Sequence, residues 1–180
     1  TSKSTDDVFE TSVLRARRSL QSLAEQRDKS LAPKYAKLLD EADDERQALH
    51  ALWALNLCQS LHETDDLAVR YLQHRYSAVR AWTVRLLGDE SHVTPPVREQ
   101  LVKMARDEVD VRVRAQLACT AKRLPGDDCL AIAVELARHD EDQTDPYLPL
   151  LLWWAVESKT VTDRDQVLSW LENSGDWQSP

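Results

Sequence analysis

The sequence predicts an all-helical protein built from about five stacked helix pairs, an α-α superhelix. Three observations support this prediction. Apolar residues recur at helical spacing in about ten short blocks, and none of the blocks alternates in the two-residue pattern of a strand. Only 3 of the 180 residues are glycine, too few for a series of tight hairpins or a glycine-rich phosphate loop. Similar residues also return about every 34 positions, which is typical of a repeat array.

Polar breaks between the blocks mark where helices are expected to begin. Each break offers a capping oxygen, a proline for the first turn or an early carboxylate. The breaks are Thr64-Asp65-Asp66, Thr94-Pro95-Pro96, Pro125-Gly126-Asp127, Asp145-Pro146 and Thr162-Asp163. In chain order, the expected helices cover residues 6–26, 31–42, 45–61, 65–74, 77–88, 95–107, 110–124, 127–139, 146–158 and 163–173.

An arginine column defines the repeat. Arg46, Arg80 and Arg114 follow one another at this same repeat step, and one further step reaches Leu148. A second column consists of Trp53, Leu87, Ala121 and Ala155. We therefore expect residues 1–180 to form one domain, cut from a longer multidomain chain because it lacks an initiator Met. Its expected units are about 8–41, 42–75, 76–109, 110–143 and 144–177.

Two repeat families are compatible with this period. Tetratricopeptide repeats need a glycine near the middle of the first helix, whereas the glycine expected within a helix here, Gly88, stands at a helix end. HEAT repeats place an acidic turn before a Val-Arg-x-x-Ala-like start, as around Asp110 and Arg114. The sequence therefore favours a HEAT-like solenoid. Turn acids such as Asp110 are expected to pair with Arg46, Arg80 and Arg114 and to keep successive units in register.

The charge is concentrated at one end. The chain has 31 acidic and 23 basic residues and a formal charge of −8, which makes nucleic acid an unfavourable partner. Residues 125–180 contain 12 acidic and 3 basic side chains, so an electrostatic partner is expected at the C-terminal end. The sequence has no apolar run long enough to cross a bilayer, so no membrane span is expected.

Four segments resemble the helical-repeat part of a family of very large bacterial proteins described as membrane-bound dehydrogenases. They are 50–55 (HALWAL), 79–89 (VRAWTVRLLGD), 109–125 (VDVRVRAQLACTAKRLP) and 146–157 (PYLPLLLWWAVE). The shorter stretches 128–130 (DCL) and 138–142 (RHDED) match as well, and the resemblance covers about residues 45–172. Family members combine a sorbosone- or glucose-dehydrogenase-like β-propeller, a HEAT array and a cytochrome c domain. The resemblance implies an exported, periplasmic parent protein engaged in electron transfer, with haem c and a quinone bound outside this segment.

The segment itself is expected to hold no catalytic, cofactor-binding or metal site. A c-type haem needs Cys-x-x-Cys-His, and Cys58 to His62 gives only Cys-x-x-x-His. That pair alone cannot complete a metal site, and the acidic run after His139 lacks the glycine of a calcium loop. Cys119 and Cys129 fall on consecutive helices, where a disulfide is possible, although buried free thiols fit better.

Exposed tryptophans are the expected partner contacts. Trp53 and Trp154 fall on core columns, whereas the adjacent Trp153 must point about 100° away, either under the neighbouring helix or outward. An outward-facing Trp153, together with Trp82, is the candidate partner contact.

Three functions follow from these features. The leading one is a scaffold or protein-interaction module that links the catalytic and haem domains of a dehydrogenase-like parent. The first alternative is a general protein-binding module that uses the acidic end. A less favoured alternative is a helical-repeat enzyme similar to nucleic-acid glycosylases, which would need a basic concave stripe with a central carboxylate.

Overall fold

The computed structural model describes residues 29–58, 61 and 64–173, and all regular structure in these residues is helical. The expected helix at 6–26 lies outside this described part. The α-helices are α2 (Ala32–Asp40), α3 (Glu45–Leu57), α4 (Asp65–Leu72), α5 (Ser77–Leu87), α6 (Pro95–Asp107), α7 (Val111–Ala121), α8 (Gly126–Leu136), α9 (Leu148–Glu157) and α10 (Arg164–Asn173). Short 3-10 helices are η1 (Lys29–Leu31), η2 (Gly88–Glu90) and η3 (Asp140–Thr144). Each described α-helix overlaps an expected one.

The chain divides into two compact units, Thr1–Thr64 and Asp65–Pro180. This division falls at the start of α4, and the single domain with a repeat boundary after residue 75 stays a prediction. In the first unit α2 packs against α3, which buries Leu39 and Leu52 completely. The second unit contains α4 to α10, and the arginines at positions 80 and 114 belong to it.

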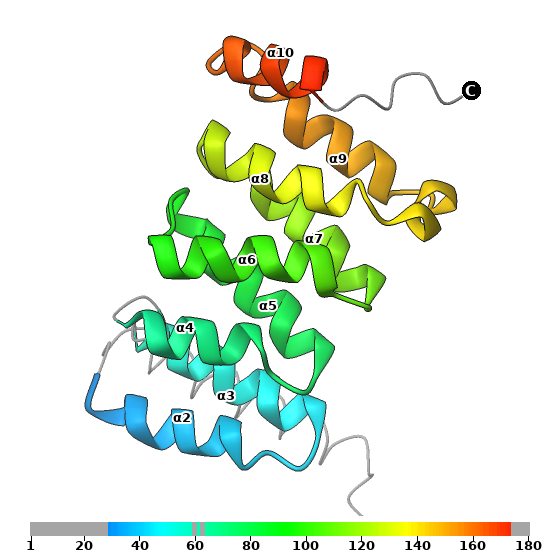
Figure 1. The fold of residues 1–180 in the computed structure, drawn as a ribbon. Helices are drawn as coiled ribbons and strands as arrows, with labels where there is room; N and C mark the ends of the chain where they lie inside the picture. Colours follow the sequence, from blue (N-terminus) through cyan, green and yellow to red (C-terminus); the bar gives the residue numbers. More distant parts are fainter. Residues whose placement is uncertain (1–28, 59–60, 62–63, 174–180) are drawn as a thin grey trace, which may run out of the picture. The chain divides into compact units, whose positions relative to one another are not determined.

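Helices of the second unit pack in two rows (Figure 1). One row consists of α4, α6, α8 and α10, and the other consists of α5, α7 and α9. Each helix contacts the second helix after it, and most also contact their sequence neighbour in the other row. The side chains between the rows are apolar and fully or almost fully buried, among them Leu101, Leu117, Ile132, Leu136 and Leu148. Leu130 and Ala133 of α8, Val156 of α9 and Val167 of α10 form an apolar cluster that joins the last three helices.

Local chemistry explains where helices begin. Asp44 and Asp110 are N-cap residues whose side chains accept from the backbone N–H of Gln47 (2.8 Å) and Arg112 (2.9 Å). Asp145 accepts from the N–H of Tyr147 and of Leu148, so α9 begins at Leu148, two residues after the expected start. The proline at 146 therefore precedes the helix.

Gly88 lies at a close contact between α5 and α7. A Cβ atom on Gly88, at the end of α5, would lie 2.5 Å from Cγ2 of Thr120 in α7. Real Cβ atoms do not come this close to a neighbour, so only glycine allows these helices to approach as they do. At this close approach the Thr120 hydroxyl donates to the carbonyl oxygen of Val84 in α5 (3.3 Å).

Candidate functional site

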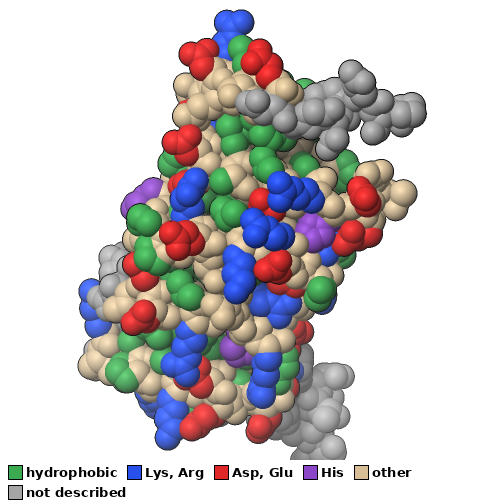
Figure 2. Space-filling model, viewed as in Figure 1, with side chains coloured by type: hydrophobic (Ala, Val, Ile, Leu, Met, Phe, Trp, Pro, Cys, Tyr) green, Lys and Arg blue, Asp and Glu red, His purple; other side chains and the backbone are tan. Residues whose placement is uncertain are grey.

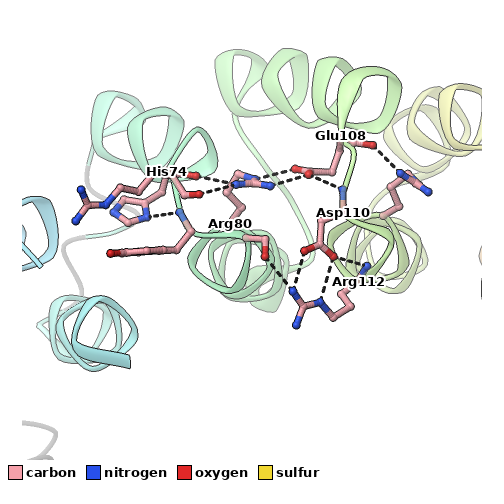
Figure 3. Close-up of polar contacts among 9 residues, drawn as sticks. His74, Arg80, Glu108, Asp110 and Arg112 are labelled. Carbon is pink, nitrogen blue, oxygen red and sulfur yellow. Dashed lines mark hydrogen bonds and ion pairs between the residues drawn. The ribbon is translucent and has the colours of Figure 1, made fainter. Parts of the chain in front are cut away.

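Arg80 joins two successive helix pairs of the second unit (Figure 3). Its Nε and Nη2 atoms donate to the two carboxylate oxygens of Glu108, at 2.8 and 2.7 Å. Its Nη1 atom donates to the carbonyl oxygen of His74 at 2.9 Å. The guanidinium therefore lies between the turn that precedes α5 and the turn that precedes α7.

Arg114 repeats this arrangement one unit later. Its Nε and Nη2 atoms donate to both carboxylate oxygens of Asp142, at 2.6 and 2.5 Å, and its Nη1 atom donates to the Glu108 carbonyl oxygen at 2.8 Å. In both cases the carboxylate lies 28 residues after the arginine and the carbonyl six residues before it. We call this arrangement the arginine clasp. Glu108 belongs to both clasps, because it accepts from Arg80 with its side chain and from Arg114 with its backbone.

The two clasps are strongly polar and well shielded from water. The side chains of Arg114 and Asp142 are only 4% and 7% exposed, and those of Arg80 and Glu108 are 17% and 5% exposed. The hydrogen bond to its carboxylate partner raises the pKa of each arginine further. Burial pushes the pKa of Glu108 upward, but hydrogen bonds from Arg80 and from the Asp110 N–H outweigh it, so its pKa lies below the usual value.

Asp110, the turn acid that the sequence singled out, does not occupy the clasp position. The acid that pairs with Arg80 is Glu108, two residues earlier. Asp110 caps α7 and pairs with Arg112 at 2.9 Å, and Arg112 also donates to the Ser77 hydroxyl of the preceding unit. Hydrogen bonds from Arg112, above all, and from Ser77 hold the pKa of Asp110 well below its usual range. Asp110 thus supports the same turn by a different contact.

Arg46, the first member of the column, lies exposed on α3 in the first unit. The residue that follows it at the clasp offset is His74, which has no carboxylate to offer. The sequence therefore repeats the arginine at position 46 but has no acid at the position 28 residues later.

A second set of contacts joins the ends of α5, α7 and α9, and the sequence reasoning missed it. Arg123, after α7, donates to the carbonyl oxygen of Arg85 at 3.0 Å and pairs with Asp89. Lys159, after α9, donates to the carbonyl oxygen of Lys122 at 3.0 Å. Cations at helix C-termini satisfy carbonyls that lack an intrahelical partner. The sequence signal that could have predicted these contacts is a Lys or Arg just after the ends of α7 and α9.

Tryptophans of α5 and α9 differ in exposure. Trp153 is 58% exposed and faces outward, as expected, and Trp82 is partly buried beneath the guanidinium of Arg85, 5.1 Å from the ring centroid. Trp154, expected in the core, is 43% exposed, and the Lys122 ammonium lies over its ring at 5.7 Å. Its repeat equivalent is Thr120, which is fully buried.

The cysteines are free thiols in different surroundings. Cys129 is buried and donates to the Ala155 carbonyl oxygen at 3.5 Å, and burial raises its pKa to about 11. Cys119, on α7, is exposed, contrary to the expected burial. Cys58 is buried, and His62 falls outside the described residues. Within the described residues, His, Cys, Asp and Glu form no group of three that could hold a metal ion.

The face formed by α4, α6 and α8 mixes both charges (Figure 2). Lys and Arg side chains gather over the C-terminal ends of α6 and α8, but Arg106 and Arg138 both pair with Glu135 at 2.9 and 2.8 Å. A surface groove of about 710 Å³ between α4 and α6 is lined by acids, bases and amides together. This face therefore lacks the uniform positive charge that a phosphate backbone requires.

Neither a protein-family model nor a curated protein nor a solved structure matches this chain. The class that the described residues define is an all-helical protein, in which the helices of the second unit pack in two rows. Among the described helices, not one has the length and apolar character needed to cross a bilayer.

Proposed function

We propose that this chain is a non-catalytic HEAT-type scaffold that holds other protein domains in place. The observation that carries the proposal is the arginine clasp, found twice with the same offset between arginine and acid. Each clasp ties one helix pair to the next, so the pairs act as equivalent units of an array. In such arrays stability is close to a sum of contacts between neighbouring units, and the extended surface serves for binding.

The roles of the carboxylates support a structural rather than catalytic function. Glu108 and Asp142 bind arginines, while Asp110 and Asp145 cap helices. These acids, which lie in the turns between helices, are thus used to hold backbone and side chains. General acid–base catalysis needs a carboxyl group that can exchange its proton near neutral pH, whereas the contacts of Glu108, Asp110 and Asp145 lower the pKa of these three acids and favour their charged form.

The binding partners proposed first are the neighbouring domains of a dehydrogenase-like parent protein. This part of the proposal rests on the resemblance of residues 45–172 to the repeat segment of that family. Haem c and a quinone would belong to the neighbouring domains. Chemical crosslinking of the intact gene product, read by mass spectrometry, is expected to link this segment to a propeller on one side and a haem domain on the other. A gene that encodes neither domain would contradict it.

A second candidate is a general protein-binding module that uses the acidic end, and it is favoured by the exposed aromatic side chains of α9. It predicts binding to a basic protein that weakens steeply as salt is raised. The glycosylase-like alternative has less support, since Arg80 and Arg114 already bind carboxylates. A filter-binding assay with duplex DNA that saturates at moderate salt would favour it instead.

A further inference from the structure

Helix α9 exposes a strip of large apolar side chains. Leu150, Trp153 and Trp154 are 46%, 58% and 43% exposed, and they lie within two turns of one helix. In α5 and α7 of the same row, Val111 is the one residue with comparable exposure among the large apolar side chains. Contiguous exposed apolar surface of this kind marks a place where another molecule binds.

Basic side chains cover two of the tryptophans in this row of helices. Arg85 lies over Trp82, and Lys122 lies over Trp154. Trp153 occupies the repeat position of Arg85, because the two are separated by twice the repeat step. At this repeat position α5 carries Arg85, whose guanidinium covers the Trp82 ring, whereas α9 carries the ring of Trp153 itself.

The charge around Trp153 favours an added cation. Helix α9 contains no Lys or Arg, and Glu157, one turn after Trp153 on the same side of the helix, is exposed. The nearby Lys159 ammonium is engaged by the Lys122 carbonyl, and the Lys122 ammonium by Trp154. An aromatic face with a carboxylate beside it suits a guanidinium or ammonium group, which gains a cation–π contact and an ion pair together.

We propose that Leu150, Trp153 and Glu157 form a docking surface for a basic protein segment. An arginine or lysine of that segment stacks on Trp153 and pairs with Glu157, and an apolar neighbour covers Leu150. This inference rests on the proposed scaffold function and names the chemistry of a partner. The carboxylate of Glu157 and the surplus of acids in residues 125–180 disfavour nucleic acid and anionic lipid at this surface.

The test uses a fluorescein-labelled peptide of alternating leucine and arginine, added to the full chain and followed by fluorescence anisotropy. Binding is expected, and it is expected to weaken as salt rises. Trp153→Ala should weaken binding about tenfold, and Glu157→Gln about threefold. Trp82→Ala is the matched control, since Arg85 already covers that ring, and it should leave the affinity unchanged.

Three results would overturn the docking surface. They are equal binding of a leucine–glutamate peptide, unchanged affinity in Trp153→Ala, and sedimentation showing that two copies of the chain associate through Trp153 in place of the peptide. Unaltered thermal unfolding of Trp153→Ala shows that a lost affinity is not a folding defect. If the peptide fails while crosslinks to flanking domains persist in the intact protein, this surface is wrong and the scaffold stands. If both fail, the scaffold function is wrong as well.

Discussion

The arginines of the repeat column have different surroundings in the two compact units. In the second unit Arg80 and Arg114 each bind a carboxylate with two hydrogen bonds and a backbone carbonyl with a third. In the first unit Arg46, at the same spacing, is exposed on α3. In the sequence, the residue 28 positions after the arginine is Glu108 for Arg80 and Asp142 for Arg114, whereas it is His74 for Arg46.

The repeat spacing thus fixes the position of the arginine. Its contribution to stability depends on whether a later turn provides a carboxylate as its partner. A buried guanidinium is stable only with its charge balanced and its donors satisfied. The three arginines therefore form a natural series, from a fully enclosed pair to an exposed side chain.

The largest effect is expected at the most buried clasp. Arg114→Met leaves the Asp142 carboxylate buried without its partner, so the free energy of unfolding should fall by about 3–5 kcal/mol. Urea unfolding followed by circular dichroism measures this. Arg114→Lys, which keeps the charge but loses the bidentate geometry, should fall between wild type and Arg114→Met. A loss below about 1 kcal/mol for Arg114→Met would show that the clasp is not what holds these helix pairs.

A smaller loss is expected at the other clasp. Arg80→Met should lower the free energy of unfolding by about 1–3 kcal/mol, because Glu108 keeps its hydrogen bond from the Asp110 N–H. The matched substitution Arg46→Met should change it by less than about 0.5 kcal/mol. Equal effects at positions 46 and 80, in the same urea titration, would remove the distinction between the two units.

The close approach of α5 and α7 gives a third test. Gly88→Ala should destabilise the chain by about 1–3 kcal/mol, since its Cβ would meet Cγ2 of Thr120. Thr120→Ser removes that methyl group but keeps the hydroxyl, so the double variant should regain much of the loss. Thermal unfolding of the two single variants and the double variant measures this. Strictly additive losses would mean that the contact with Thr120 is not the cause.

Acid should weaken the clasp between Arg80 and Glu108 gradually. The pKa of Glu108 is lower in the folded chain than its ordinary value of about 4.3, so the unfolded state takes up its proton first as the pH falls. The resulting stabilisation is complete above about pH 5 and is lost as the pH falls through the folded pKa. Urea midpoints measured from about pH 7 to about pH 3 should fall below about pH 4.5, and less steeply for Glu108→Gln. Parallel curves for wild type and variant would exclude Glu108 as a source of the acid sensitivity.

Most helices follow from the sequence, because apolar periodicity and polar breaks report on burial and capping directly. The start of α9 does not, since Pro146 is an equally good first-turn residue and only the contacts of Asp145 place the start at Leu148. The arginine column also follows from spacing, but its acids do not. Asp110 is the N-cap residue of α7 and bonds to the backbone two residues on, while Glu108, two residues earlier in the turn, reaches Arg80.

Exposure of the aromatic residues was harder to predict. Trp154 shares its column with the buried Thr120, and residue spacing alone carries no information on whether the space at that position fits an indole. Cys119 faces solvent for a related reason, since small apolar residues are tolerated on either side of a helix. Both depend on the packing of neighbouring helices, which periodicity within one helix does not reveal.

The claim that arginine clasps join successive helix pairs is tested most directly by a double-mutant cycle on Arg114 and Asp142. The cycle compares the free energy of unfolding of the wild type, Arg114→Met, Asp142→Leu and the double variant. The clasp predicts a coupling energy of about 2–3 kcal/mol, with the double variant far more stable than the sum of the single losses implies. A coupling energy below about 0.5 kcal/mol would contradict it.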